Sequence, residues 1–125
     1  MKARIGVVGI GWWAAFNHIP TVQAGADADI VAICDLDPER LQIAGDKFGI
    51  TGRYTDVAAM LAAERLDGVM ISTPHIHHTA PAIAALEAGC HVLVEKPMAV
   101  TVAEADAMIG FAARAGRTLD RKSVV

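Results

Sequence analysis

A glycine loop near the N-terminus is the feature that most constrains the fold. Residues 4–10 (RIGVVGI) have the apolar composition of a buried strand, and residues 12–24 have the pattern of a helix. Along this stretch Gly9, Gly11 and Ala14 form the pattern G-x-G-x-x-A. The first glycine permits a tight turn, the second admits a pyrophosphate close to the backbone, and the small third residue lets the helix pack on the strand. The pattern predicts a dinucleotide-binding βαβ unit, whose helix N-terminus offers free N–H groups to the phosphates.

An acidic residue follows at the spacing that such a unit requires. Asp35 ends the second apolar run, residues 29–34 (DIVAIC), and lies 21 residues after Ala14. A carboxylate at this place accepts hydrogen bonds from the adenosine ribose and repels a 2′-phosphate, so we expect NAD as the cofactor. NADP stays open, because Arg40 is close enough to swing onto such a phosphate. The alternative for Asp35 is a turn residue that leads into the Asp37-Pro38 pair.

Two tryptophans follow the second glycine directly. Trp12 and Trp13 either shield the cofactor beside the pyrophosphate or pack under the neighbouring loop. Packing is favoured for at least one of them, because a flat apolar ring is rarely left in water.

The rest of the chain alternates short apolar runs with helical ones. Short apolar strands separated by helices predict an α/β fold with a doubly wound parallel sheet, covered on both faces. We expect residues 1–119 to form this Rossmann domain. Residues 117–119 begin a last strand, and residues 120–125 (DRKSVV) are expected to be an atypical tail with no partner element. The other expected strands are residues 29–34, 53–54, 67–72 and 91–94, and the other expected helices are residues 38–48, 56–64, 77–88 and 101–115, with Asp37 capping the first of these and Thr55 or Asp56 the second.

Composition excludes several classes of protein. The net charge is −3 and the basic residues are scattered singly, which argues against nucleic-acid binding. No run of about 18 apolar residues is present to span a membrane, and the N-terminus lacks a signal-peptide core, so we expect a cytoplasmic protein. Cys34 and Cys90 each lie in or beside an apolar strand, and we expect both to be reduced, packed thiols.

Polar residues gather where two later strands end. Residues 72–78 (STPHIHH) end the fourth apolar run from the N-terminus, and residues 94–97 (VEKP) end the next. Ligands bind at the carboxyl ends of the strands in such a sheet, so we expect both segments at the site. Lys96 there can orient a substrate hydroxyl or polarise a carbonyl. The alternative is a surface lysine paired with Glu95.

Three histidines stand close together in the first of these segments. His75, His77 and His78 lie on a predicted strand-to-helix turn with no acidic ligand beside them, so we expect no metal site.

With these segments in place, the sequence closely resembles the N-terminal domain of the glucose–fructose oxidoreductase / inositol dehydrogenase / MocA (Gfo/Idh/MocA) family. The similarity covers residues 3–119. It is carried by VGIGWWA at 8–14, HIP at 18–20, CDLDPER at 34–40, STPHIHH at 72–78 and AGCHVLVEKPMAVTVAEA at 88–105, of which the EKP stretch is the most specific.

The resemblance implies an NAD(P)-dependent oxidoreductase that acts at a carbon of a sugar or cyclitol. It implies that Glu95 and Lys96 border the nicotinamide, and that Lys96 is the catalytic residue, which positions the substrate hydroxyl or relays its proton. His78 falls on a family histidine, whereas His75 stands where the family more often has asparagine. The expected cofactor-binding residues are Gly9, Gly11, Trp12, Trp13, Asp35, Arg40, Ser72, Thr73, Pro74, His75, His78, Glu95, Lys96 and Pro97.

Family members continue into a second α/β domain that supplies the substrate pocket, and the chain is expected to be a truncated form without it. Hydride transfer needs substrate and nicotinamide held together and shielded from water, so a polyol substrate would bind only if a substrate domain were supplied. An alternative is a non-catalytic nucleotide-binding or interaction module, whose exposed apolar surface associates with a second copy, as a homo-oligomer, or with a partner. A methyltransferase using S-adenosylmethionine is a further alternative, which the EKP stretch and the G-x-G-x-x-A form disfavour.

Overall fold

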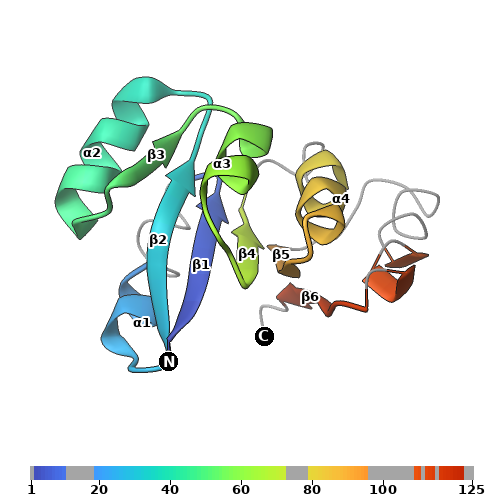
Figure 1. Cartoon of the computed structure of the whole chain (residues 1–125). Helices are drawn as coiled ribbons and strands as arrows, with labels where there is room; N and C mark the ends of the chain where they lie inside the picture. Colours follow the sequence, from blue (N-terminus) through green and yellow to red (C-terminus); the bar gives the residue numbers. More distant parts are fainter. Residues whose placement is uncertain are drawn as a thin grey trace.

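All the strands that the structure describes belong to one parallel sheet. The computed structural model describes residues 2–10, 19–72, 79–95, 109–110, 112–114 and 116–122. Within these residues the sheet has six strands in the order β3-β2-β1-β4-β5-β6, and every neighbouring pair is parallel (Figure 1). The strands are β1 (Ala3–Val8), β2 (Ala28–Cys34), β3 (Gly52–Tyr54), β4 (Gly68–Ile71), β5 (His91–Glu95) and β6 (Leu119–Lys122).

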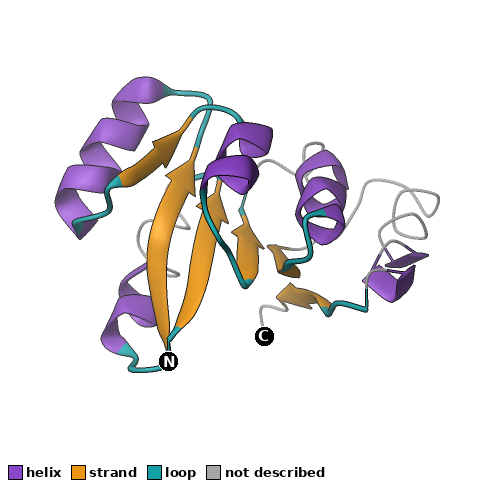
Figure 2. Cartoon of the chain, viewed as in Figure 1, coloured by secondary structure: helices purple, strands orange, loops and turns teal. Residues whose placement is uncertain are grey.

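The strand order reverses beside β1, which confirms the doubly wound Rossmann fold class. From β1 the chain moves outward through β2 to β3, and it then returns to β4 on the other side of β1. This is the 3-2-1-4-5-6 order of dinucleotide-binding sheets. Each crossover between described strands passes through helical residues, as Figure 2 shows for the part of the chain described. The helices are α1 (Ile19–Ala24), α2 (Pro38–Phe48), α3 (Val57–Ala63) and α4 (Thr79–Glu87).

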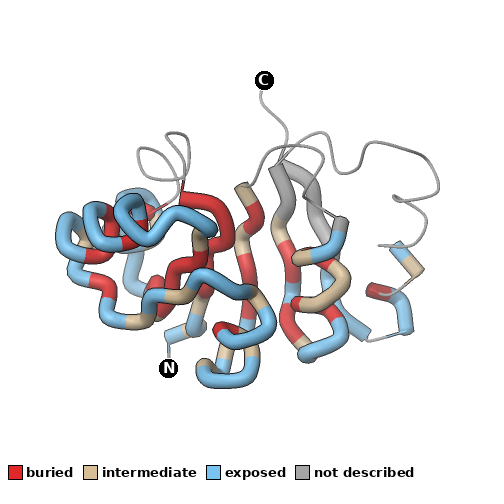
Figure 3. Tube along the Cα trace, turned by 90° about the horizontal axis from the view of Figure 1, so that it is seen from above, coloured by how far each residue is buried: buried red, intermediate tan, exposed pale blue. Residues whose placement is uncertain are grey.

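Apolar side chains on successive residues of the central strands form two separate cores. Val7 and Ile33 join the core under α1 and α2, whereas their neighbours Val8 and Cys34 join the core under α3 and α4. Successive side chains of a strand point to opposite faces, so this alternation means that both faces are covered. In Figure 3 the buried residues concentrate in the strands and on the helix sides toward them.

The helix boundaries follow the local capping chemistry. Asp37 caps α2 by accepting a hydrogen bond from the Glu39 N–H at 3.0 Å, and Pro38 occupies the first turn. Gly49 ends this helix with a left-handed φ of 68°. Of the two predicted caps for α3, Asp56 is the one used, because its side chain accepts from the Ala59 N–H.

The prediction that residues 120–125 lack a partner element was wrong for residues 120–122. They belong to β6, which pairs in parallel with β5 through Leu93↔Asp120, Val94↔Arg121 and Glu95↔Lys122. The sequence here is polar, so a pattern of apolar residues does not detect it. Among the described strands β6 lies at an edge of the sheet, where backbone pairing defines a strand and charged side chains are common.

Both cysteines are free and buried, as predicted. Burial among apolar side chains, helped by the negative charges of Asp35 and Asp56, raises the pKa of the Cys34 thiol from 9.0 to about 11. Burial likewise raises the pKa of Cys90, whose thiol contacts the Leu66 carbonyl oxygen at 3.5 Å. Neutral thiols are poor nucleophiles, so both residues serve packing.

Gly52 provides a test of how closely β3 approaches β2. A Cβ at this position would lie 2.6 Å from the Val31 carbonyl oxygen and 3.0 Å from Oε2 of Glu64. Since the first neighbour is backbone, Gly52→Ala should lower the free energy of unfolding by about 1–3 kcal/mol in urea titration. The matched control is Gly25→Ala, whose nearest neighbour lies at an ordinary 3.5 Å. Equal effects of the two substitutions would contradict this packing.

Cys34 predicts a specific pH dependence of stability. The thiol ionises near pH 9.0 when exposed in the unfolded chain but only near pH 11 in the folded one. Between these values unfolding releases a proton, so the contribution of Cys34 to stability is lost as the pH rises from 9 to 11. The difference in free energy of unfolding between wild type and Cys34→Ala should therefore narrow over this range. Parallel pH curves for the two proteins would refute the assignment.

Candidate cofactor-binding site

The carboxyl ends of the central strands meet at one edge of the sheet, at the point where the strand order reverses. Gly9 follows β1, and its N–H donates to the Cys34 carbonyl oxygen of β2 at 2.8 Å. Ser72 follows β4, and its N–H donates to the Val8 carbonyl oxygen of β1 at 2.8 Å. Three strand ends are thereby tied side by side. Ligands bind in open parallel sheets at this switch point.

Gly9 makes the turn that leads out of β1. Its φ is 82°, a left-handed conformation that glycine adopts without the strain of a Cβ. The tight turn predicted for this position is therefore present. The residue that follows, Ile10, is 2% exposed and packs into the core under α1 and α2.

Asp35 lies at the centre of a hydrogen-bond network at this edge. Its Oδ2 accepts from the Ile10 N–H at 3.1 Å, and its Oδ1 accepts from the Asp37 N–H at 2.9 Å. Its own N–H donates to the Tyr54 carbonyl oxygen at 3.0 Å. The side chain is only 10% exposed. Asp35 is thus a turn residue, as the alternative interpretation held, and it also contacts the start of the glycine loop.

Arg40 extends this network toward solvent. Its Nη1 lies 3.4 Å from Oδ2 of Asp35, and its side chain is 52% exposed. An ion pair of this length whose cation is half exposed contributes little to stability, so the guanidinium can leave the carboxylate at small cost.

The Ser72 hydroxyl is a buried polar group at the same edge. Its Oγ has almost no solvent contact and no hydrogen-bond partner among the described residues. A buried hydroxyl without a partner is costly, and such a group at a ligand-binding edge fits a site whose ligand supplies the partner. Together with the open turn at Gly9 and the carboxylate of Asp35, this group fits a dinucleotide.

The structure brings together part of the predicted set. Gly9, Asp35 and Ser72 follow the ends of neighbouring strands, Arg40 reaches Asp35 from α2, and Glu95 ends β5, the next strand along. The remaining predicted residues lie outside the described ones, and so do the three clustered histidines. These predicted residues are Gly11, Trp12, Trp13, Thr73, Pro74, His75, His78, Lys96 and Pro97.

Sequence reasoning missed two features of this edge. One is the Ile10 N–H, which is a backbone group and leaves no signal in the sequence beyond its place inside the glycine pattern. The other is Leu36, an apolar side chain that is 86% exposed beside Asp35. An apolar residue between two aspartates in a turn is the signal that identifies it.

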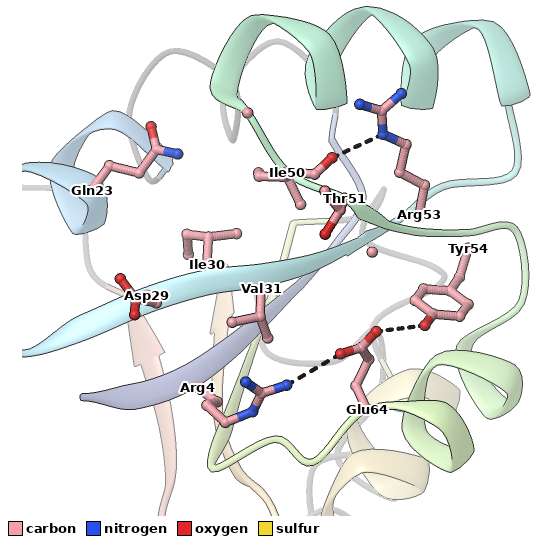
Figure 4. A pocket seen from close by; sticks show the side chains of 12 residues that line it. Arg4, Gln23, Asp29, Ile30, Val31, Ile50, Thr51, Arg53, Tyr54 and Glu64 are labelled. Atoms are coloured by element: carbon pink, nitrogen blue, oxygen red, sulfur yellow. Dashed lines mark hydrogen bonds and ion pairs between the residues drawn. The ribbon is translucent and has the colours of Figure 1, made fainter. Parts of the chain in front are cut away.

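A hollow apart from the candidate site lies alongside β3, toward the amino-terminal parts of β1 and β2 (Figure 4). It has a volume of about 770 Å³, and none of the predicted site residues lines it. Of its charged lining residues, Arg4 and Glu64 pair with each other, whereas Asp29 pairs with Lys2 and Arg53 with Asp46. Arg4 contacts Glu64 at 3.3 Å, and the Tyr54 hydroxyl donates to the other oxygen of Glu64, a contact that raises the pKa of Tyr54. These contacts join β1, β3 and the end of α3, so they stabilise the fold.

The part of the chain that the structure describes contains neither a candidate metal site nor a helix that could span a membrane. In that part of the chain no three His, Cys, Asp or Glu side chains gather as a metal site would require. None of its helices has the length and apolar character needed to cross a membrane.

Comparison with known proteins relates the chain to one family of oxidoreductases. A model of an oxidoreductase family with an NAD-binding Rossmann fold (GFO_IDH_MocA) matches residues 3–122. D-Apiose dehydrogenase of Paraburkholderia graminis is 43% identical over 110 residues, which are 88% of this chain and 29% of that protein. The chain therefore spans less than a third of the length of this relative.

Solved structures have the same fold. The WlbA dehydrogenase of Bordetella pertussis, in complex with NADH and UDP-GlcNAcA, superposes with a TM-score of 0.91 at 36% identity, over 98% of this chain and 37% of that one. An oxidoreductase from Agrobacterium radiobacter, in complex with NAD+, L-tartaric acid and magnesium, superposes with a TM-score of 0.92 at 33% identity. The match covers 97% of this chain and 35% of that one. The match of the family model to nearly the whole chain, together with these relatives, shows that the chain belongs to the Gfo/Idh/MocA oxidoreductase family and carries its NAD-binding Rossmann fold.

Proposed function

We propose that this chain holds NAD at the carboxyl edge of its sheet and serves as the cofactor-binding part of a dehydrogenase of sugar-like or cyclitol-like substrates. The observation that carries the proposal is the placement of Asp35. Its largely buried carboxylate ends β2 and contacts the start of the glycine loop, so the two parts that a dinucleotide needs lie together.

The residues at the edge take separate parts in this proposal. Gly9 and Gly11 let the pyrophosphate approach the backbone, with Trp12 and Trp13 beside it. Asp35 accepts hydrogen bonds from the hydroxyls of the adenosine ribose. Bound nicotinamide would supply the centre that accepts or donates a hydride.

The next two strand ends complete the site. Ser72 offers a hydroxyl that has no hydrogen-bond partner among the described residues, and the residues that follow it, Thr73, Pro74, His75 and His78, border the cofactor. Leu36 offers an exposed apolar surface beside Asp35 against which an adenine ring can pack. Glu95 and Pro97 border the nicotinamide on either side of Lys96.

Lys96 is the proposed catalytic residue. It follows β5 directly, and β5 ends at the same edge of the sheet as β1 and β4. A lysine there can donate a hydrogen bond to a substrate hydroxyl and hold it toward the hydride acceptor, which contributes through positioning and proton transfer.

The substrate class rests on the relatives. One is a D-apiose dehydrogenase, and another was solved in complex with NADH and UDP-GlcNAcA. We therefore infer a carbohydrate-like substrate that binds between this domain and a further part of the enzyme, since the chain spans only about a third of these proteins. The alternative of a non-catalytic module is not favoured, because these relatives are dehydrogenases.

Calorimetric titration of the purified chain tests cofactor binding. NAD should bind more tightly than NADP, because Asp35 places negative charge where NADP carries its 2′-phosphate. In Asp35→Ala the affinity for NAD should fall roughly tenfold while the preference over NADP narrows or disappears. Asp29→Asn removes a carboxylate from the opposite end of the same strand. It should change neither the affinity for NAD nor the preference for NAD over NADP. Absence of binding heat with both nucleotides would refute the proposal.

The role of Lys96 is tested by turnover in a protein that joins this chain to a substrate domain of the family. Lys96→Met should lower kcat by roughly 10²-fold or more, while the affinity for NAD falls far less than in Asp35→Ala. Loss of NAD binding without a specific loss of kcat would instead make Lys96 a cofactor ligand only.

A further inference from the structure

We propose that Asp35 also positions the glycine loop, so that binding of the phosphates depends on this carboxylate independently of any contact with the ribose. The inference deepens the proposed nucleotide function and rests on it. It rests on the partners of the two oxygens of Asp35. One of them accepts a backbone N–H of the loop itself.

The start of the loop is held from three directions. The Gly9 N–H is tied to β2 through the Cys34 carbonyl oxygen, at 2.8 Å. The Ile10 N–H is tied to Oδ2 of Asp35, at 3.1 Å. The Ile10 side chain is buried at 2% exposure in the core under α1 and α2. Of the two hydrogen bonds among these ties, only the one to Asp35 has a side-chain acceptor, so it is the hydrogen bond that a substitution can remove.

This tie is stronger than an ordinary turn contact. Its acceptor is a carboxylate that is 10% exposed, and hydrogen bonds to charged groups in such surroundings exceed those between neutral groups. The carboxylate is itself fixed, because Oδ1 accepts from the Asp37 N–H at the first turn of α2. The start of the glycine loop is therefore anchored through Asp35 to the cap of α2.

The two roles of Asp35 make different demands on the ligand. A ribose acceptor matters only for a nucleotide that carries the ribose hydroxyls. A loop-positioning residue matters for every ligand whose phosphates use the loop, because without Asp35 the Ile10 N–H loses its partner and the turn has to be ordered on binding. The two roles are separated by measuring how the removal of Asp35 changes the affinity for a nucleotide that lacks the ribose hydroxyls.

The experiment compares ADP with 2′,3′-dideoxy-ADP, which differ only in those hydroxyls. Affinities for both are measured by calorimetry on wild type, Asp35→Ala, Asp35→Asn and the charge control Asp29→Asn. Asp35→Ala should lower the affinity for dideoxy-ADP roughly tenfold. Asp35→Asn should be intermediate, because its amide oxygen can still accept from the Ile10 N–H. Asp29→Asn should match wild type. Dideoxy-ADP affinity that stays within about twofold in Asp35→Ala would overturn the inference.

A second measurement needs no nucleotide. Hydrogen–deuterium exchange of the Ile10 amide, followed by NMR on the ligand-free chain, should be about tenfold faster in Asp35→Ala than in wild type or Asp29→Asn. Unchanged exchange would overturn the inference. If wild type binds neither ADP nor NAD, the proposed function fails while the exchange experiment still decides the role of Asp35. Far-ultraviolet circular dichroism checks the folding of each variant. If Asp35→Ala does not fold, the dideoxy-ADP affinity and the exchange of the Ile10 amide are measured on Asp35→Asn instead.

Discussion

Burial of the central strands on both faces is the constraint on which the rest of the structure depends. In β1, Val7 faces one core and Val8 the other, so neither side of the strand has room for a polar side chain. Polar chemistry can then be placed only where the strands end. Gly9, Asp35 and Ser72 each follow the last apolar residues of a central strand, and parallel pairing brings these positions to the same edge. The location of the site is thus a consequence of how the core is built.

The same constraint explains why the carboxylate of Asp35 is so well satisfied. Asp35 comes directly after the buried residues 32–34 of β2 and is itself largely buried, and a buried charge is stable only where hydrogen bonds replace its water. The backbone donors to its carboxylate are the N–H groups of Ile10 and Asp37. One belongs to the glycine loop and the other to the turn before α2. The cost of burying Asp35 is therefore offset by contacts that fix the start of the glycine loop and the turn before α2, the two segments beside the proposed dinucleotide site.

The sequence predicted most of this arrangement because its signals are local. The strands follow from apolar runs, the start of α2 from Asp37-Pro38, and the turn after β1 from Gly9. The strand at 120–122 was missed because its residues are polar and only the pairing with β5 makes it a strand. The contact between Asp35 and Ile10 was missed because it joins a side chain to a backbone N–H 25 residues away, and a backbone group has no letter in the sequence.

Arg40 sets a limit on how strictly Asp35 can select between NAD and NADP. The exposed guanidinium rests 3.4 Å from Oδ2, on the same oxygen that accepts from Ile10. In the proposed complex, ribose hydroxyls would meet Arg40 at this oxygen, whereas Oδ1 accepts from the Asp37 N–H. Because an ion pair with a half-exposed cation is weak, displacing Arg40 would cost little, and the cation would stay near Asp35 on α2. A 2′-phosphate would meet the repulsion of Asp35 together with the attraction of this cation. The proposed preference for NAD is thus a difference between two opposing charges, and its size depends on Asp35 being held more firmly than Arg40.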